Sequence, residues 1–202
     1  MVWSDPDRWW PLDLREPPGA LTQWRIRLLA ADLQSCRRVL ARSDIPATPV
    51  PSRPMANGCG YADAVALTGG ALSGSPAMRC ANAAAYAAWT RHVVQPAAER
   101  HLGSRVTRVR TFGAYSCRDI AGRPGRRSQH ATANAIDVSG FDLADGRSVT
   151  LLAHWDKGAA GRFLAEARDG ACGLFAGVLS PDWNAAHRDH FHLDMGRLDI
   201  CR

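Results

Sequence analysis

Six cysteines are spread over the whole chain of 202 residues, and they constrain the fold more than any other feature. None of them forms a C-x-x-C pair, so zinc ribbons and thioredoxin-like redox sites are disfavoured. An even, dispersed set is typical of disulfide bonds in an oxidising compartment, with buried free thiols in a cytosolic protein as the alternative. The spacing does not select one pairing among the candidates. The six disulfide candidates are Cys36, Cys59, Cys80, Cys117, Cys172 and Cys201.

The composition is that of an ordinary globular protein, with 46% hydrophobic and 22% charged residues. The length favours one domain, with two small domains as the alternative. The net charge of +6 rests almost wholly on arginine, since Lys157 is the only lysine. A basic protein suits nucleic acid, an anionic lipid surface or an acidic polymer such as peptidoglycan. Because there is no K/R-rich run and no basic helix with interleaved aromatics, we expect no nucleic-acid partner.

Residues 1–20 are rich in proline, tryptophan and charge, and they predict an extended tail. Trp9 and Trp10 are expected to pack on the domain surface or to lie near a membrane interface. The segment has acids and prolines where a signal peptide has its apolar stretch. Because disulfides require export, we expect that a signal or membrane anchor was removed and that Met1 was added. Residues 21–202 are then the folded domain of a periplasmic or secreted monomer, in contact with a membrane only through the missing anchor.

Hydrophobic periodicity predicts both helices and strands. Apolar residues at helical spacing predict helices over residues 21–40, 77–102 and 157–168. Pro96 is expected to kink or divide the second helix, and Gly103 to end it. Strands are expected over residues 65–72, 106–115, 135–138, 148–153 and 190–194. Turn-forming residues predict loops or turns over residues 43–60, 118–127 and 141–146.

This order of elements predicts an α+β fold. A small, mostly antiparallel sheet would carry a zinc site, pack against N-terminal helices and be stabilised by disulfides.

Four of the seven histidines lie in two short segments, SQHATANAID and HRDHFHLD. Residues two apart on a strand share a face. We therefore expect His190, His192 and Asp194 on one face of the last strand, and Phe191 and Leu193 on the other face, in the core. Two such imidazoles either share a metal, or one binds the metal while its neighbour transfers protons.

The first segment ends in an aspartate, and its small residues allow the chain to turn tightly between the histidine and that acid. Two neutral histidines and one carboxylate leave a zinc ion with net positive charge and an open fourth position, which suits a catalytic site. A pH-sensing patch of imidazoles is the alternative interpretation.

The order Ser-x-His, Ala-x-Asp, His-x-His resembles the S-x-H-x-x-G-x-A-x-D and H-x-H motifs of one metallopeptidase superfamily. Its members include lysostaphin, the D-Ala-D-Ala carboxypeptidases and sonic hedgehog. Ala133 stands in place of the glycine of the motif, and alanine tolerates most backbone conformations other than φ > 0.

From about Pro11 to Arg202, phrases such as VQPAAERHLG, SQHATANAIDVSGF and LSPDWNAAHRDHFHLDMG resemble the bacterial extensin-like protein family (the extensin-like C-terminal domain). The proline-rich repeats of plant extensins are absent. The resemblance implies the fold of a peptidoglycan-directed zinc peptidase that is exported and anchored at its N-terminus.

Carried over position by position, the resemblance implies that His130, Asp137 and His192 bind one zinc ion. His190, the first member of His-x-His, would be the general base or would stabilise the transition state. His187 lies where other branches have a glutamate, so it is the alternative general base.

The neighbouring polar residues receive supporting roles. Asp189 and Asp194 are expected to orient imidazoles or to be structural. The resemblance implies that Arg118, with Tyr115, anchors a substrate carboxylate, and a plain surface arginine is the alternative. Ser128 either hydrogen-bonds substrate or caps the turn.

The leading hypothesis is a zinc-dependent peptidase that hydrolyses amide bonds in peptidoglycan stem peptides or cross-links, as a murein endopeptidase or a D,D-carboxypeptidase. The alternative is a catalytically inactive, zinc-containing module of the cell envelope that binds peptidoglycan or a protein. A secreted toxin aimed at rival cell walls would share the chemistry of the leading hypothesis.

Overall fold

The computed structural model describes residues 11–68 and 71–202. The predictions for Trp9 and Trp10, and half of the predicted tail, lie outside these residues. The fold is mixed α+β with mostly antiparallel sheets and three disulfide bonds, as expected from the sequence. Within the described ranges, no helix is both long and apolar enough to cross a membrane.

The segment predicted as one helix over residues 21–40 is broken at Asp32. The pieces are α2 (Thr22–Leu28), a 3-10 turn (Leu29–Ala31) and α3 (Leu33–Arg42). Asp32 has an extended backbone, and its carboxylate accepts hydrogen bonds from the backbone N–H groups of Gln34 and Ser35. A side-chain acceptor of this kind caps a helix N-terminus, so the break starts a new helix.

The long helix predicted over residues 77–102 starts at Cys80, because Met78–Arg79 form the short strand β5. It consists of α4 (Cys80–Trp89), a π-helical turn (Thr90–Val94) and α5 (Gln95–Leu102). Pro96 lies just after the π-helical turn, and the helix is divided there as predicted, while the backbone of Val94 and Gln95 keeps helical dihedral angles. Gly103 ends α5 with φ of 65°.

Two segments predicted as loops contain strands that the sequence did not predict, although the turn expected at Asn57-Gly58 is present. Residues 43–60 contain β1 (Ala47–Pro49), β2 (Arg53–Ala56) and most of β3 (Cys59–Tyr61). Asn57 and Gly58 both have positive φ, which makes the two-residue turn that favours a β-hairpin. Residues 118–127 fold in the same way, as β7 (Asp119–Ile120) and β8 (Arg123–Arg127). The strand predicted at residues 65–72 is β4 (Ala64–Leu67).

The main sheet has six strands, and β9 lies at its centre. β6 pairs with one edge of β9, while β10 and β12 pair with the other. All the pairings are antiparallel except that of β11 with β13. The bounds are β6 (Val106–Gly113), β9 (Ala135–Leu143), β10 (Ser148–Thr150), β11 (Gly177–Leu179), β12 (Phe191–Asp194) and β13 (Ile200–Cys201).

Four of these strands were predicted, and two of them differ from the prediction by more than two residues. β9 continues to Leu143, so the turn expected at residues 141–146 is confined to residues 144–146. The strand expected over residues 148–153 stops at Thr150, whose hydroxyl caps the short helix α6 (Leu151–His154).

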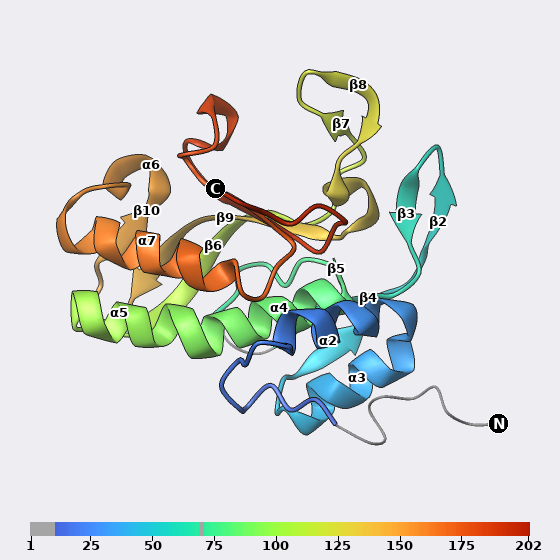
Figure 1. Ribbon diagram of the computed structural model, residues 1–202, viewed down its shortest axis with the longest axis horizontal. Coiled ribbons are helices and arrows are strands. Elements are labelled where there is room, and N and C mark those ends of the chain that lie inside the picture. Colours follow the sequence, from blue (N-terminus) through green and yellow to red (C-terminus); the bar gives the residue numbers. More distant parts are fainter. Residues whose placement is uncertain (1–10, 69–70) are drawn as a thin grey trace.

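One face of the sheet is covered by helices, as Figure 1 shows. Phe141 of β9 packs against Trp89 of α4 and Phe163 of α7 (Gly158–Ala171), with ring centroids 6.1 and 5.0 Å apart. All three side chains are fully buried, and each contributes about 1.5–3 kcal/mol by leaving water. α2 and α3 pack on α4 rather than on this sheet. The opposite face of β9 and β12 is therefore left for polar groups.

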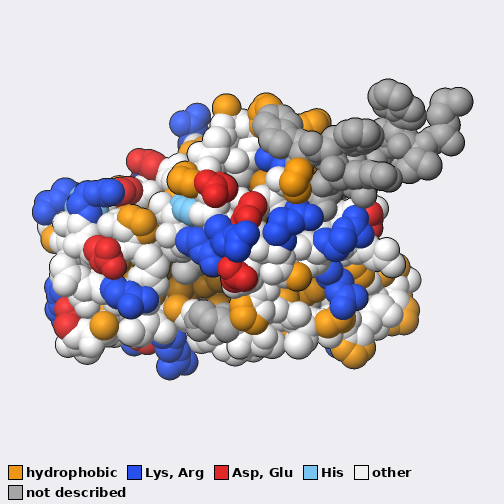
Figure 2. Space-filling model, turned by 90° about the horizontal axis from the view of Figure 1, so that it is seen from below, with side chains coloured by type: hydrophobic (Ala, Val, Ile, Leu, Met, Phe, Trp, Pro, Cys, Tyr) orange, Lys and Arg blue, Asp and Glu red, His pale blue; other side chains and the backbone are white. Residues whose placement is uncertain are grey.

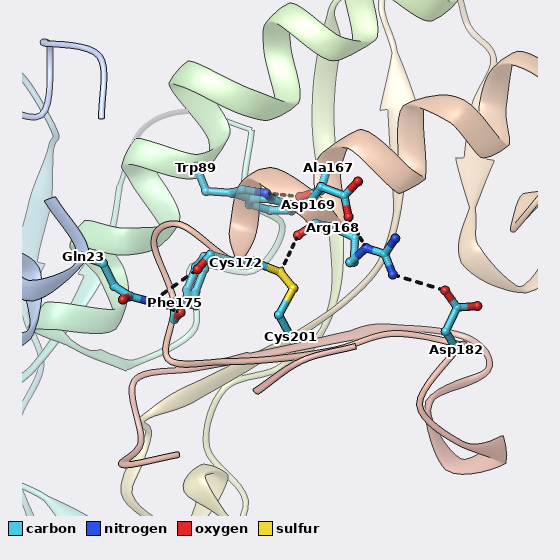
Figure 3. Close-up of a disulfide and its surroundings, with 9 residues drawn as sticks. All are labelled: Gln23, Trp89, Ala167, Arg168, Asp169, Cys172, Phe175, Asp182 and Cys201. Atoms are coloured by element: carbon cyan, nitrogen blue, oxygen red, sulfur yellow. Dashed lines mark hydrogen bonds and ion pairs between the residues drawn. A yellow bond between two sulfur atoms is a disulfide. The ribbon is translucent and has the colours of Figure 1, made fainter. Parts of the chain in front are cut away.

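All six cysteines are paired, which confirms the expectation of a disulfide framework. Cys36–Cys80 joins α3 to α4, and Cys59–Cys117 joins β3 to the segment that follows β6. Cys172–Cys201 joins the end of α7 to β13. Figure 3 shows this third disulfide beside Gln23, whose side-chain N–H groups donate to the carbonyl oxygens of Cys172 and Phe175. α2, α7 and the C-terminal strand are thus fastened together.

Candidate metal centre

The pairing of β9 with β12 brings two of the predicted ligands together. His192 lies directly opposite Asp137 in this antiparallel pair, so the two side chains leave the same face of the sheet. Phe191 and Leu193 are fully buried on the helix-covered side, as the alternation of the sequence predicted.

Two β-bulges where β6 pairs with β9 set the direction of the side chains around Asp137. The residue pairs Arg110–Gly140 and Thr111–Val138 leave Ser139 as an extra residue in β9. The pairs Thr111–Val138 and Gly113–Asp137 leave Phe112 as an extra residue in β6. The first bulge allows Asp137 to face the site while Phe141 faces the core. Bulges often re-aim side chains in this way beside functional sites.

His130 comes from a 3-10 turn, Gln129–Thr132, that precedes β9. Ser128 caps this turn by accepting a hydrogen bond at its hydroxyl from the backbone N–H of His130. The turn ends at Ala133, whose φ of 54° lies in the left-handed region. The position where the resembling motif has glycine therefore does require φ > 0, at a cost to alanine of about 1–2 kcal/mol.

Three side-chain atoms converge on one point. His130 Nε2, Asp137 Oδ1 and His192 Nδ1 each lie 3.0 Å from the other two. All three residues are buried, and among the described residues they form the one group suited by type and spacing to hold a metal ion.

The far side of each imidazole shows which nitrogen carries the proton. His130 Nδ1 lies 3.0 Å from the carbonyl oxygen of Ala114, and His192 Nε2 lies 3.0 Å from a carboxylate oxygen of Asp194. Both partners can only accept, so these nitrogens are the donors. The two nitrogens that face Asp137 then carry lone pairs when the rings are neutral. Such anchoring by a carbonyl or a carboxylate is typical of metal-binding histidines.

The donor set fits a zinc ion. Three buried electron-pair donors repel one another unless a proton or a cation lies between them. A triangle with edges of 3.0 Å leaves room for a cation about 2.0–2.1 Å from each corner, the usual range for zinc with nitrogen and oxygen ligands.

The pKa shifts of Asp137 and His192 in the metal-free protein also indicate that these side chains need a proton or a cation between them. Burial raises the pKa of Asp137, but hydrogen bonds from His130 and His192 outweigh burial and hold it well below its ordinary value. Burial lowers the pKa of His192, but Asp137 and Asp194 outweigh burial and raise it to about 9. Without a metal ion, the cluster therefore holds one proton tightly, on His192 beside the ionised carboxylate of Asp137.

Both histidines predicted as alternative bases lie beside the cluster. His190 Nδ1 donates to Asp189 at 2.9 Å, and its Nε2 lies 3.7 Å from Asp137 Oδ1. His187 Nδ1 donates to the amide oxygen of Asn184 at 2.8 Å, and its ring lies 5.1 Å from that of His190. Each ring thus keeps a lone pair on Nε2. Burial and the nearby histidines lower the pKa of His187 to about 4, so that side chain is neutral at pH 7.

Of the residues predicted to contact substrate, Arg118 reaches the cluster, whereas Tyr115 packs against the hairpin formed by β2 and β3. Arg118 is half-exposed, and its guanidinium lies 3.8 Å from Asp137 Oδ2. Tyr115 packs edge-to-face on Tyr61, with the guanidinium of Arg53 4.8 Å above its ring. Ser128 is seen in its capping role, and its contact with substrate stays a prediction.

Three contributors to the site were missed at the level of sequence. The carbonyl of Ala114 is a backbone group and leaves no signal. Asn184 caps the 3-10 turn Ala185–His187, and an asparagine three residues before a histidine was a signal that could have been used. Phe112 is exposed by the bulge and packs edge-to-face on His190, with ring centroids 5.8 Å apart.

A cavity of about 840 Å³ lies elsewhere, between α3 and β1. Its lining contains arginines and Asp44 but neither histidine nor cysteine. The site is therefore identified from the convergent side chains rather than from the size of a cavity.

Comparison with known proteins places the chain in one family. The family model described as extensin-like protein C-terminus matches residues 34–202. No curated protein and no solved structure matches the chain. The matched residues include all six cysteines, the three members of the candidate metal site and both flanking histidines.

Proposed function

The chain belongs to the family of extensin-like protein C-terminal domains, and on this premise we propose that it is a zinc-dependent peptidase that hydrolyses amide bonds in peptidoglycan. The proposal includes membership of the superfamily of lysostaphin, the D-Ala-D-Ala carboxypeptidases and sonic hedgehog. The observation that supports it most is the buried triangle of lone pairs on His130, Asp137 and His192. The fixed tautomers of both imidazoles make this triangle a preformed metal site.

His130, Asp137 and His192 would hold the ion, and Ala114 and Asp194 would orient the two imidazoles. Zinc bound in this way polarises a carbonyl oxygen and supplies a nucleophile at neutral pH.

His190 is the proposed general base. Its Nε2 has a free lone pair and lies nearest to the cluster, while Asp189 holds the opposite nitrogen as the proton donor. A carboxylate in this place also stabilises the imidazolium that forms when His190 takes a proton. His190 then returns that proton to the leaving amine.

His187 is proposed to orient substrate rather than to take the proton. Its pKa of about 4 makes it a weak base, and its Nε2 can only accept a hydrogen bond. A substrate N–H is a suitable donor to that nitrogen.

Arg118 is proposed to bind a carboxylate of the stem peptide. Its guanidinium is half-exposed, so it is open to a second anion in addition to Asp137. A carboxylate at the end of the peptide would favour carboxypeptidase action, and one within a cross-link would favour endopeptidase action. Peptidoglycan lies outside the cytoplasm, and the three disulfides support the proposed periplasmic or secreted location, where the protein would act as a monomer.

The test is digestion of purified sacculi by the zinc-loaded protein, with mass spectrometry of the released muropeptides. We expect new free amines in the stem peptides, loss of cleavage in the presence of a chelator, and recovery when zinc is returned. His192→Ala and His190→Ala should both abolish cleavage, and His154→Ala, on α6, is the matched control. Sacculi that are bound but never cut by the zinc-loaded protein would reject the peptidase and support the inactive binding module instead.

A further inference from the structure

Two hairpins stand beside the metal centre and form a unit that we call the hairpin lobe, residues 53–61 and 118–127. Figure 1 shows β2–β3 and β7–β8 projecting from the same end of the molecule. The Cys59–Cys117 disulfide joins the first hairpin to the base of the second. The side chain of Arg127, at the end of β8, also donates a hydrogen bond of 2.8 Å to the carbonyl oxygen of Asn57, in the turn between β2 and β3.

The position of the lobe relative to the metal centre is fixed by the backbone. The chain enters the second hairpin just after Ala114, whose carbonyl holds His130, and leaves it at Ser128, which caps the turn of His130. Two backbone hydrogen bonds close this junction: Ser116 N–H donates to the oxygen of His130, and Ser128 N–H donates to that of Arg118, both at 3.1 Å. A molecule that binds the lobe is therefore held next to His130 and the candidate metal site.

The lobe is strongly basic, with five arginines against the single acid Asp119. Asp119 is already paired with Arg127 at 2.7 Å. Arg123 and Arg126 are exposed on β8 and have no ion pair within the described part of the chain. Since all five residues of β8 are exposed, this strand contributes nothing to the core.

Several arginines elsewhere on the surface are paired with acids, while others, such as Arg37 and Arg162, are exposed and form no ion pair with the residues that the structure describes. Ion pairs join Arg110 to Asp142, Arg147 to Asp145, and Arg168 to both Asp169 and Asp182. Figure 2 shows the helix-covered side of the molecule, where acidic side chains lie among the basic ones. The lobe, with five arginines and one aspartate, nevertheless carries a net charge of +4 out of the +6 of the whole chain.

We propose that the hairpin lobe binds the free carboxylates of peptidoglycan stem peptides, so that the enzyme selects stems whose carboxyl groups are not amidated. This inference rests on the proposed function, because it takes peptidoglycan as the substrate. Exposed arginine side chains on a rigid hairpin suit a long anionic polymer. They raise the local concentration of the polymer, and the protein can still move along it. Arg123 and Arg126 determine binding and specificity, and they take no part in bond cleavage.

The test measures binding and cleavage separately, with the zinc-loaded full chain. Co-sedimentation uses intact sacculi and sacculi whose carboxyl groups have been converted to neutral methylamides. We expect the wild type to bind the intact sacculi about 10-fold more tightly. The double variant Arg123→Gln/Arg126→Gln should lose about 3- to 10-fold in affinity for the intact sacculi and most of this preference. The matched control is Arg37→Gln/Arg162→Gln, which removes two exposed arginines from α3 and α7 and should bind like the wild type.

Equal loss of binding in both double variants, or equal binding to both kinds of sacculi, would overturn the inference. Binding of duplex DNA as tight as that of sacculi, with the same dependence on Arg123 and Arg126, would also overturn it, because the lobe would then be a general polyanion surface. These outcomes are distinct from failure of the proposed function. In that case carboxylate-dependent binding would persist while no bond was cut.

Discussion

Strands β9 and β12 differ from the hairpin lobe in where their side chains lie. Seven of the nine residues of β9 are buried, and its side chains are divided between an aromatic core and the candidate metal site. Every residue of β2 and β8 is exposed, and the lobe is held by a disulfide and by hydrogen bonds. A metal site needs ligands fixed within a fraction of an ångström, which packing provides. Contact with a polymer needs accessible charge, which an unburied hairpin provides.

Shortening a side chain should change the free energy of unfolding far more in the core than in the hairpin lobe. Phe141→Ala removes a ring packed between Trp89 and Phe163, and it should lower the free energy of unfolding by about 3–5 kcal/mol. Met55→Ala, at an exposed position in β2, should change it by less than about 0.5 kcal/mol. Chemical denaturation of the two variants measures both values. Similar losses would show that the lobe is packed as tightly as the core.

The metal centre should make the stability of the metal-free protein depend on pH. The folded pKa of His192, about 9, lies above its ordinary value of 6.5, so its contribution is complete below about pH 6.5. That contribution, on the order of 3 kcal/mol, is lost as the pH rises through about 9. The zinc-loaded protein should lack this loss, because the ion takes the place of the proton. Denaturation curves between about pH 6 and pH 10, with and without zinc, test this, and parallel curves would argue against a shared site. Binding by the lobe should depend instead on ionic strength.

The carboxylates of Asp194 and Asp189, which contact His192 and His190, should affect different properties, namely zinc affinity and catalytic rate. Asp194→Asn weakens the orientation of the ligand His192 and should lower zinc affinity about 10- to 100-fold, as measured by competition with a chelator. Asp189→Asn acts on His190 instead, and it should leave zinc affinity unchanged while lowering kcat. The assignment of base and ligand would be reversed if Asp189→Asn were the variant that lost zinc.

The smallest effect is expected at Ala133. Glycine there relieves the left-handed strain, but it removes a buried methyl group and makes the unfolded chain more flexible. Ala133→Gly should therefore change the free energy of unfolding by less than about 1 kcal/mol and leave zinc affinity unchanged. Thermal unfolding and zinc titration of this variant provide the check. A large loss of zinc would show that the turn needs the alanine methyl rather than only its backbone conformation.

Much of the fold and the cluster was predictable because periodicity and residue spacing are local signals. Alternation around His192 predicted the burial of Phe191 and Leu193, and Gly103 predicted the end of α5. The hairpins were mistaken for loops because β2 and β8 bury nothing and so show no hydrophobic pattern. The Asn57-Gly58 pair was nevertheless a hairpin signal.

Other features depend on pairing between distant segments, and no local pattern encodes them. The bulges at Ser139 and Phe112 arise from the register of β6 against β9. The proton positions of His130 and His192 follow from Ala114 and Asp194, and only the second of these partners was foreseen. The disulfide pairing likewise follows from the folded arrangement of α3, α4 and the lobe.

The central claim is that His130, Asp137 and His192 hold one zinc ion, and the most direct test is the metal content of the purified protein. After saturation with zinc and removal of the excess, elemental analysis should find one zinc per chain in the wild type. His192→Ala should retain almost none, and the control His154→Ala should retain one. Absence of zinc from the wild type, or an undiminished content in His192→Ala, would contradict the account.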